Sequence, residues 1–136
     1  MEEARLIRRI RFLASHHYAR ADLSEEDNRR MFGDQSRAHE HDWTIEVRVR
    51  GPIDARTGFV TDLGSLDRAL EEVLEGWSDG DLNQLIPEVE AGTMSPSTES
   101  LARWIYRHLG PSVAAPARLE AVAVFESSEL GAEYPV

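Results

Sequence analysis

The sequence predicts an α+β fold in which two helices cover one face of an antiparallel sheet. Residues 43–50 alternate between apolar and polar side chains, which indicates a half-buried strand. Two later segments carry apolar residues at helical spacing, and a further apolar run follows them. Placing both helices on one face of the sheet buries the apolar sides of both kinds of element.

The first half of the chain is expected to form two strands with a long connection between them. Residues 5–15 place apolar side chains between arginines and predict the first strand. Residues 23–30 resemble a helix start, because Ser24 can cap a helix and an aspartate follows three positions later. A loop is expected over 31–38, before the second strand at 43–50.

The second half is expected to supply the two main helices. The first is predicted over 63–76, with Asp62 or Ser65 as its cap. The second is predicted over 98–109, where a Gly-Pro pair ends it. The remaining segments are expected to be polar loops over 77–83 and 88–97, a strand over 119–125 and a short strand near Tyr134.

Composition restricts the classes of function. The length of 136 residues predicts one domain, 1–136, and the net charge of −10 argues against a nucleic-acid partner. No segment is apolar enough to span a membrane, and no signal-peptide pattern is present, so a cytoplasmic location is expected. Cysteine and lysine are absent, which excludes disulfides, a thiolate and a lysine Schiff base. Exposed edges of the predicted sheet favour a homo-oligomer.

Three histidines form the candidate metal site. Residues i and i+2 of a strand point to the same face, so His39 and His41 would present two imidazoles side by side. His16 ends the first predicted strand and can supply a third. Three imidazoles that leave one position open are a common catalytic zinc arrangement. His17 is an alternative third ligand, although it would point to the other face of the strand.

Several segments of the chain match motifs that occur together in one protein family. Residues 12–16 (FLASH) resemble its F-x-A-x-H motif, and residues 39–43 (HEHDW) resemble its H-G-H-N-Y motif. Residues 97–102 (STESLA) are similar to the T-x-E-N-x-A that begins the second family helix, and further similar segments are 23–33, 51–60 and 122–126. In these segments the chain resembles the 6-pyruvoyl-tetrahydropterin synthases and the related 6-carboxytetrahydropterin synthases.

The resemblance implies a T-fold: an antiparallel four-stranded sheet with two helices on one face, oligomerising into a β-barrel, commonly as a hexamer. It also implies Zn²⁺ on His16, His39 and His41, and active sites at subunit interfaces. Family members act on dihydroneopterin triphosphate, a small-molecule substrate. By the same resemblance, substrate binding falls to a glutamate at the end of the last strand and to two residues at the start of the second helix. These residues are Glu126, Thr98 and Glu99.

The sequence departs from the family at the residues that transfer protons. The family cysteine falls on or near Gln35, and the D-H-x-x-L-N motif reads SDGDLN over 78–83. Gln35 cannot titrate, so it cannot replace a thiolate as a base. A carboxylate can act as a base if burial raises its pKa, which makes Asp79 or Asp81 the candidate. Gln35, Asp79 and Asp81 are therefore the candidate catalytic residues.

These features predict a zinc-dependent lyase or isomerase with altered acid–base chemistry. Its substrate would be pterin-like or another small hydroxy or carbonyl compound. One alternative is a non-catalytic member of the same fold that binds a pterin or purine-like ligand or serves in assembly. Another is an enzyme of specialised metabolism that acts on a sugar- or nucleoside-derived substrate.

Overall fold

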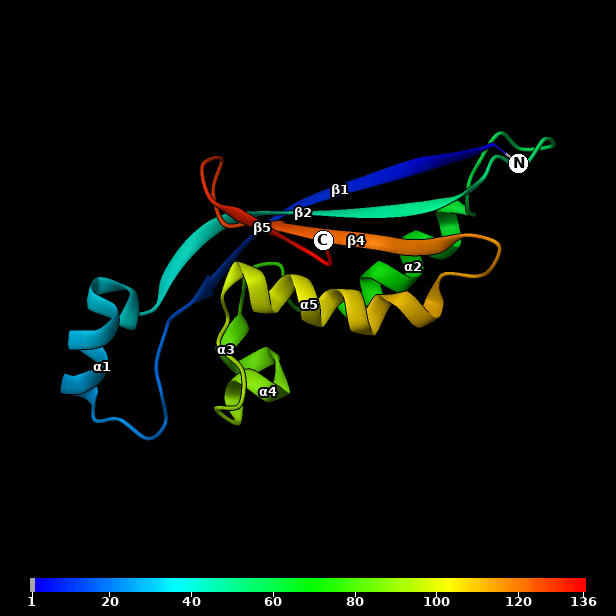
Figure 1. Ribbon diagram of the computed structural model, residues 1–136. Helices are drawn as coiled ribbons and strands as arrows, with labels where there is room; N and C mark the ends of the chain where they lie inside the picture. Colours follow the sequence, from blue (N-terminus) through cyan, green and yellow to red (C-terminus); the bar gives the residue numbers. More distant parts are fainter. Residues whose placement is uncertain (1) are drawn as a thin grey trace.

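The computed structural model describes residues 2–136 and contains a five-stranded sheet with two long helices packed on one of its faces (Figure 1). The predicted α+β class is confirmed. A short helix, α1, projects beyond the end of the sheet (Figure 1). The strands are β1 (Glu3–His16), β2 (His39–Pro52), β3 (Gly80–Asp81), β4 (Arg118–Phe125) and β5 (Gly131–Tyr134). The helices are α1 (Glu25–Phe32), α2 (Leu63–Val73), α3 (Leu82–Leu85), α4 (Pro87–Glu90) and α5 (Thr98–Leu109), with 3₁₀ turns at Gly33–Ser36 and Gly110–Ser112.

The first two strands are the longest in the sheet and form an antiparallel ribbon. Each is 14 residues long, and they pair without a register shift from Glu3 opposite Pro52 to His16 opposite His39. Both strands therefore extend further than the patterns at 5–15 and 43–50 predicted. Their extra residues include all three candidate metal ligands, which lie within regular strand pairing.

The sheet is mixed, with strand order β3-β1-β2-β4-β5. The prediction of a purely antiparallel four-stranded sheet is wrong at β3, which pairs in parallel with the end of β1. This strand lies in the segment 77–83 that was expected to be a polar loop. The segment is ordered because Trp77 is buried, 5.6 Å from the ring of Trp104 and 6.3 Å from that of Phe12.

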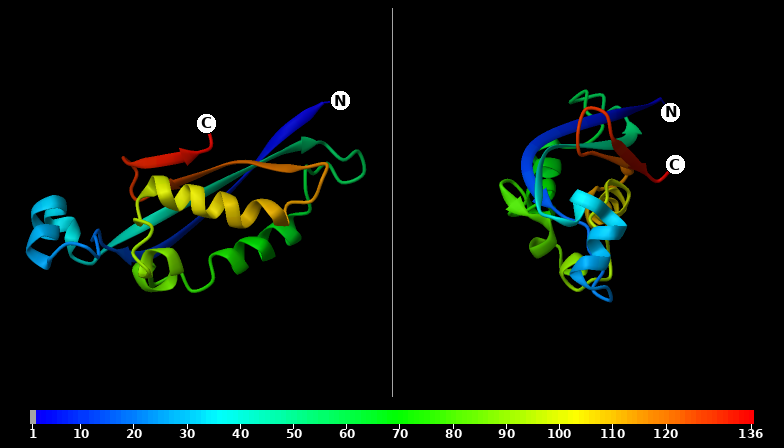
Figure 2. Two further views of the ribbon diagram at one scale, coloured as in Figure 1. Left: turned by 60° about the horizontal axis from the view of Figure 1, so that its bottom comes forward. Right: turned by 90° about the vertical axis from the view of Figure 1, so that its left-hand side faces the viewer.

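The core lies between β2, β4 and the two long helices. Alternate residues of β2 are fully buried, and the buried residues of α5 lie on one apolar side of that helix. Figure 2 shows α5 running along the sheet. The buried core residues of β2 and α5 are Trp43, Ile45, Val47, Val49, Leu101, Ala102, Ile105 and Leu109. The opposite face of the sheet carries charged pairs instead, such as Arg9 with Glu46 at 2.7 Å.

Three predicted boundaries need correction, while the cap of α1 is confirmed. α2 begins after Asp62, which caps it, but ends at Val73 rather than at Gly76, which has φ +81° and cannot continue a helix. Ser24 accepts a hydrogen bond from the Asp27 N–H as the cap of α1. Part of the expected loop 31–38 forms the end of α1 and a 3₁₀ turn, and part of the expected loop 88–97 forms α4. Within residues 2–136, no helix is long and apolar enough to cross a membrane.

Candidate metal centre

Three imidazoles meet at the end of the sheet, on the face that the helices cover. His16 is the last residue of β1 and pairs with His39, the first residue of β2, while His41 pairs with Ala14. One nitrogen from each of the three rings lies within 4.8 Å of one nitrogen from each of the other two. This group can hold a metal ion. The structure therefore brings His16, and not His17, together with the pair on β2.

Backbone carbonyls fix the orientation of two of these rings. Nδ1 of His16 lies 2.9 Å from the carbonyl oxygen of Pro96, and Nδ1 of His39 lies 2.8 Å from that of Arg37. A carbonyl can only accept, so each Nδ1 carries the hydrogen and each Nε2 keeps its lone pair. Metal-binding histidines generally have this second contact. Among the described residues, the buried Nε2 of His16 has no hydrogen-bond partner, which fits a role as a metal ligand.

Burial favours the neutral form of two of the three histidines. His16 has no exposed surface, and this burial lowers its pKa to about 4. Burial also lowers the pKa of His41. Neutral imidazole is the form that binds a metal ion, so the lowered pKa values of His16 and His41 favour the protonation state that metal binding requires. Two or more neutral nitrogen donors at this spacing suit zinc and other borderline divalent ions.

The carboxylate of Glu126 lies against the histidine cluster. Its Oε2 is 3.5 Å from Nε2 of His41 and 3.7 Å from Nε2 of His16. Glu126 directly follows β4, and its N–H donates to the carbonyl of Leu130 across the turn to β5. The residue is 9% exposed. A buried carboxylate therefore lies beside the Nε2 atoms of His16 and His41.

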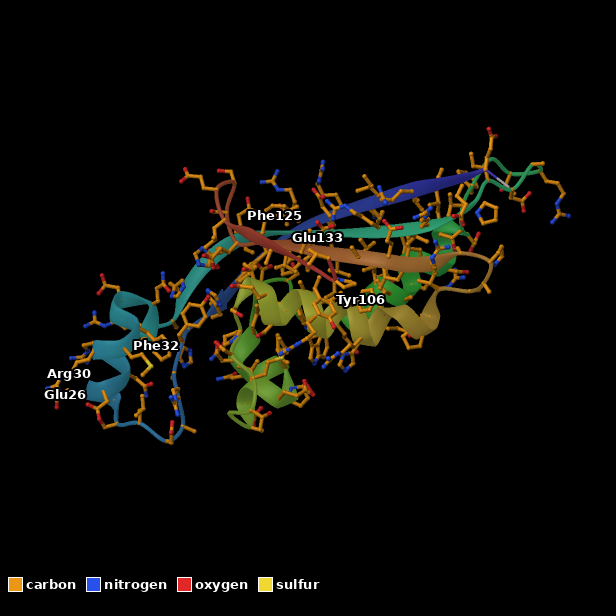
Figure 3. The ribbon with its side chains drawn as sticks, in the orientation of Figure 1. Glu26, Arg30, Phe32, Tyr106, Phe125 and Glu133 are labelled. Atoms are coloured by element: carbon orange, nitrogen blue, oxygen red, sulfur yellow. The ribbon has the colours of Figure 1, made fainter. Side chains whose placement is uncertain are left out.

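Aromatic side chains that the sequence reasoning did not assign to the site surround the histidines. Trp43 is buried beneath them, with ring centroids 4.9 Å from His16 and 5.5 Å from His41. Tyr18 stands 5.1 Å from the His16 ring and 5.9 Å from the Phe32 ring. Figure 3 shows Phe32 on α1, with Glu26 and Arg30 also on that helix. The sequence signal for Tyr18 was only its position two residues after His16.

Tyr18 is a phenol that stays protonated. Burial, with added repulsion from Glu126 and Glu99, raises the pKa of Tyr18 to about 12. Its N–H donates to the carbonyl of Gln35 at 2.8 Å, so the loop that carries Gln35 is held beside the site. The Gln35 side chain is exposed.

The two candidate bases differ in their surroundings. Asp79 is exposed and has φ +60°, and within residues 2–136 no hydrogen bond or ion pair engages its carboxylate. Burial, the condition under which its pKa would rise, is therefore not met within one chain. Asp81 is partly buried and caps α3, because its Oδ1 accepts the N–H of Asn83 at 3.0 Å. Neither carboxylate lies in the histidine cluster itself.

The start of α5 borders the cluster through the carbonyl of Pro96. Thr98 is 4% exposed, and its hydroxyl donates to Oε1 of Glu99 at 2.7 Å. This hydrogen bond lowers the pKa of Glu99, which is exposed and therefore ionised at neutral pH. The hydroxyl hydrogen of Thr98 is therefore used in the bond to Glu99.

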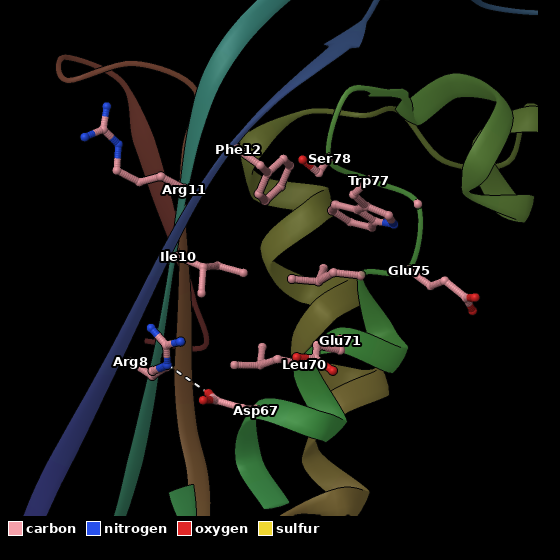
Figure 4. Close-up of a pocket in the computed structure, with 12 residues that line it drawn as sticks. Arg8, Ile10, Arg11, Phe12, Asp67, Leu70, Glu71, Glu75, Trp77 and Ser78 are labelled. Atoms are coloured by element: carbon pink, nitrogen blue, oxygen red, sulfur yellow. Dashed lines mark hydrogen bonds and ion pairs between the residues drawn. The ribbon is translucent and has the colours of Figure 1, made fainter. Parts of the chain in front are cut away.

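Two of the clefts along the sheet differ in whether a candidate metal ligand lines them. A cleft of about 710 Å³ is bordered by His41, Glu126 and the charged face of β1 and β2. A smaller cleft of about 400 Å³ lies between β1 and α2, with Arg8 paired to Asp67 at its rim (Figure 4). No candidate metal ligand lines the smaller cleft. The larger cleft is therefore the better candidate for a cleft that serves the metal centre.

Comparisons with known proteins identify relatives of the chain. The family model described as 6-pyruvoyl tetrahydropterin synthase matches residues 5–135. The 6-pyruvoyl tetrahydrobiopterin synthase of Drosophila melanogaster is 35% identical over 125 residues, which cover 90% of this chain and 73% of that protein. The Homo sapiens protein of the same name is 34% identical over 110 residues, or 79% of this chain and 74% of that protein.

A solved structure shares the fold along the whole chain. The 6-pyruvoyl tetrahydropterin synthase of Caenorhabditis elegans aligns with a TM-score of 0.88 at 24% identity, covering 100% of this chain and 97% of that one. The family match extends over nearly the entire sequence, and about a third of the residues aligned with the two synthases of Drosophila melanogaster and Homo sapiens are identical. The chain belongs to the 6-pyruvoyl tetrahydropterin synthase family.

Proposed function

We propose that this protein is a zinc-dependent lyase or isomerase that acts on a pterin-like or other small hydroxy or carbonyl substrate. The convergence of His16, His39 and His41 carries the proposal. Zinc suits this donor set, because neutral imidazoles bind it and a three-ligand site leaves a position for substrate. When bound there, zinc supplies a Lewis acid that polarises a substrate oxygen.

The substrate is held by residues around the cluster. Glu126 offers a buried carboxylate that can accept two N–H bonds from the edge of a pterin ring. Thr98 and Glu99 lie at the start of α5, where Glu99 is ionised and can accept further hydrogen bonds. The protonated hydroxyl of Tyr18 can donate to a substrate oxygen, and the amide of Gln35 can hydrogen-bond without exchanging a proton.

Proton transfer is assigned to Asp79, with Asp81 as the second candidate. The carboxylate of Asp79 is free of partners within the described chain, whereas that of Asp81 already caps α3. We further propose a homo-oligomer, such as the hexamer that the resemblance implies, with sites at subunit interfaces. Contact with a second subunit at Asp79 would supply the burial that this exposed carboxylate lacks within one chain.

The experiment compares Asp79→Asn with Asp81→Asn in zinc-loaded protein. Dihydroneopterin triphosphate is offered first, followed by a panel of small hydroxy and carbonyl compounds, and products are separated by chromatography. We expect turnover that Asp79→Asn abolishes while the zinc content stays unchanged. Full activity in both variants would refute the assignment of the base.

A second candidate function is non-catalytic binding of a pterin. The observation that favours it is the replacement of the family's cysteine, aspartate and histidine by Gln35, Ser78 and Asp79. A pterin that binds without turnover, with an affinity that Asp79→Asn leaves unchanged, would support this function. Turnover that depends on Asp79 would exclude it.

A further inference from the structure

The segment 79–83 lies along the outer edge of β1, over the residues that lead to His16. The N–H of Asp79 donates to the carbonyl of Leu13 at 2.6 Å. In β3, Gly80 then pairs with Ala14 and Asp81 pairs with Ser15. The hydroxyl of Ser15 adds a hydrogen bond to the carbonyl of Gly80 at 3.3 Å. The segment thus supports β1 residue by residue toward the metal centre.

A side chain continues this support where the backbone of the segment turns away. After Asp81 the chain enters α3, so β3 cannot pair with β1 any further. The carboxamide of Asn83 takes over: its Oδ1 accepts the N–H of His17 at 2.9 Å, and its Nδ2 donates to the carbonyl of His17 at 3.0 Å. One side chain therefore satisfies both backbone groups of the residue that follows His16.

His16 is consequently fixed from both sides. On one side it pairs with His39 of β2, and on the other side its chain neighbours Ser15 and His17 are bonded to Asp81 and Asn83. A rotation of the backbone at 16–17 would move the imidazole of His16 away from the other two rings. Metal affinity depends strongly on groups that orient the ligands.

We propose that Asn83 is a positioning residue for the metal centre, acting through the backbone of His17 on His16. The inference rests on the proposed function, because it assumes that the three histidines bind zinc. The segment 79–83, which already contains the candidate base Asp79, would then also set the position of the metal ligand His16.

The segment that connects β1 and β2 provides a matched control. Asn28 binds the backbone of Arg20 in the same two-sided manner, with its Oδ1 accepting the N–H at 2.7 Å and its Nδ2 donating to the carbonyl at 3.1 Å. Arg20 lies four residues beyond His16 and outside β1. Loss of the Asn28 contacts would loosen the connection but leave the strand pairing of His16 intact.

The test measures the zinc dissociation constant of Asn83→Ala and Asn28→Ala by competition with a chromophoric chelator. We expect Asn83→Ala to weaken zinc binding about tenfold, the lower end of the range for groups that orient ligands. We expect Asn28→Ala to bind zinc within about twofold of the parent protein, since its contacts lie away from the ligand. Hydrogen exchange of the metal-free proteins should show a faster-exchanging His17 amide only in Asn83→Ala.

Asn83→Asp keeps the test decisive if the alanine variant does not fold. It retains the acceptor for the His17 N–H but places a carboxylate oxygen, which can only accept, opposite the His17 carbonyl. Its zinc affinity should therefore also fall. Unchanged zinc affinity in the folded Asn83 variants, or an equal loss in Asn28→Ala, would overturn the inference and leave the proposed function standing. A parent protein that binds no zinc would overturn both.

Discussion

The buried ring of Trp43 packs against His16 and His41. Replacement of Trp43 by phenylalanine tests how much this packing contributes to stability and to zinc binding. The residue is 1% exposed, and its indole N–H donates to the carbonyl of Ala14 at 3.0 Å. Trp43→Phe removes this hydrogen bond, a loss of about 1 kcal/mol. The missing ring leaves a void in the core that costs about another 1–2 kcal/mol. We therefore expect the variant to lose about 2–3 kcal/mol of unfolding free energy.

The assay is urea unfolding of metal-free protein followed by circular dichroism at one fixed protein concentration. Trp104→Phe is the control, because Trp104 is only partly buried and its indole N–H bonds to the side chain of Glu88. That variant should lose less than about 1 kcal/mol. Zinc affinity should fall only in Trp43→Phe, since this ring contacts His16 and His41. Equal destabilisation by the two substitutions would refute the reasoning.

Two further predictions concern elements that support the site. Gly80→Ala should destabilise the protein and weaken zinc binding, because the new Cβ would collide with the carbonyl oxygen of Gly76 and with Leu85; thermal unfolding that matches the parent protein would contradict this. Asp62→Ala removes the cap of α2 and should cost about 1 kcal/mol by urea unfolding, with zinc affinity unchanged. A change in zinc affinity would show that α2 is coupled to the centre in a way that its distance from the histidines does not explain.

The sequence was sufficient where a short-range pattern carries the structure. The alternation over 43–50 and the apolar spacing of the two long helices reflect burial on one side, so they predicted the sheet and its helical cover. Ser24 was identified as the cap of α1, and Asp62 as one of two candidate caps of α2 beside Ser65, because capping is a local hydrogen bond. His39 and His41 were placed together by the two-residue period of a strand.

Contacts between distant segments were not accessible in the same way. β3 consists of two residues, and nothing in their sequence indicates parallel pairing with β1. The place of Trp43 beneath the histidines depends on the register of two strands, which no local pattern specifies. The double hydrogen bond of Asn83 to His17 joins residues 66 positions apart. A contact of this kind produces no periodic pattern in the sequence.

The zinc content of the purified protein tests the central claim most directly. Protein prepared without added metal, and again after reconstitution with zinc and removal of excess, is analysed by inductively coupled plasma mass spectrometry beside His39→Ala. Convergence of His16, His39 and His41 predicts about one zinc ion per chain in the reconstituted protein and its loss in the variant. A protein without stoichiometric metal in either preparation, or a variant that keeps its zinc, would contradict the account.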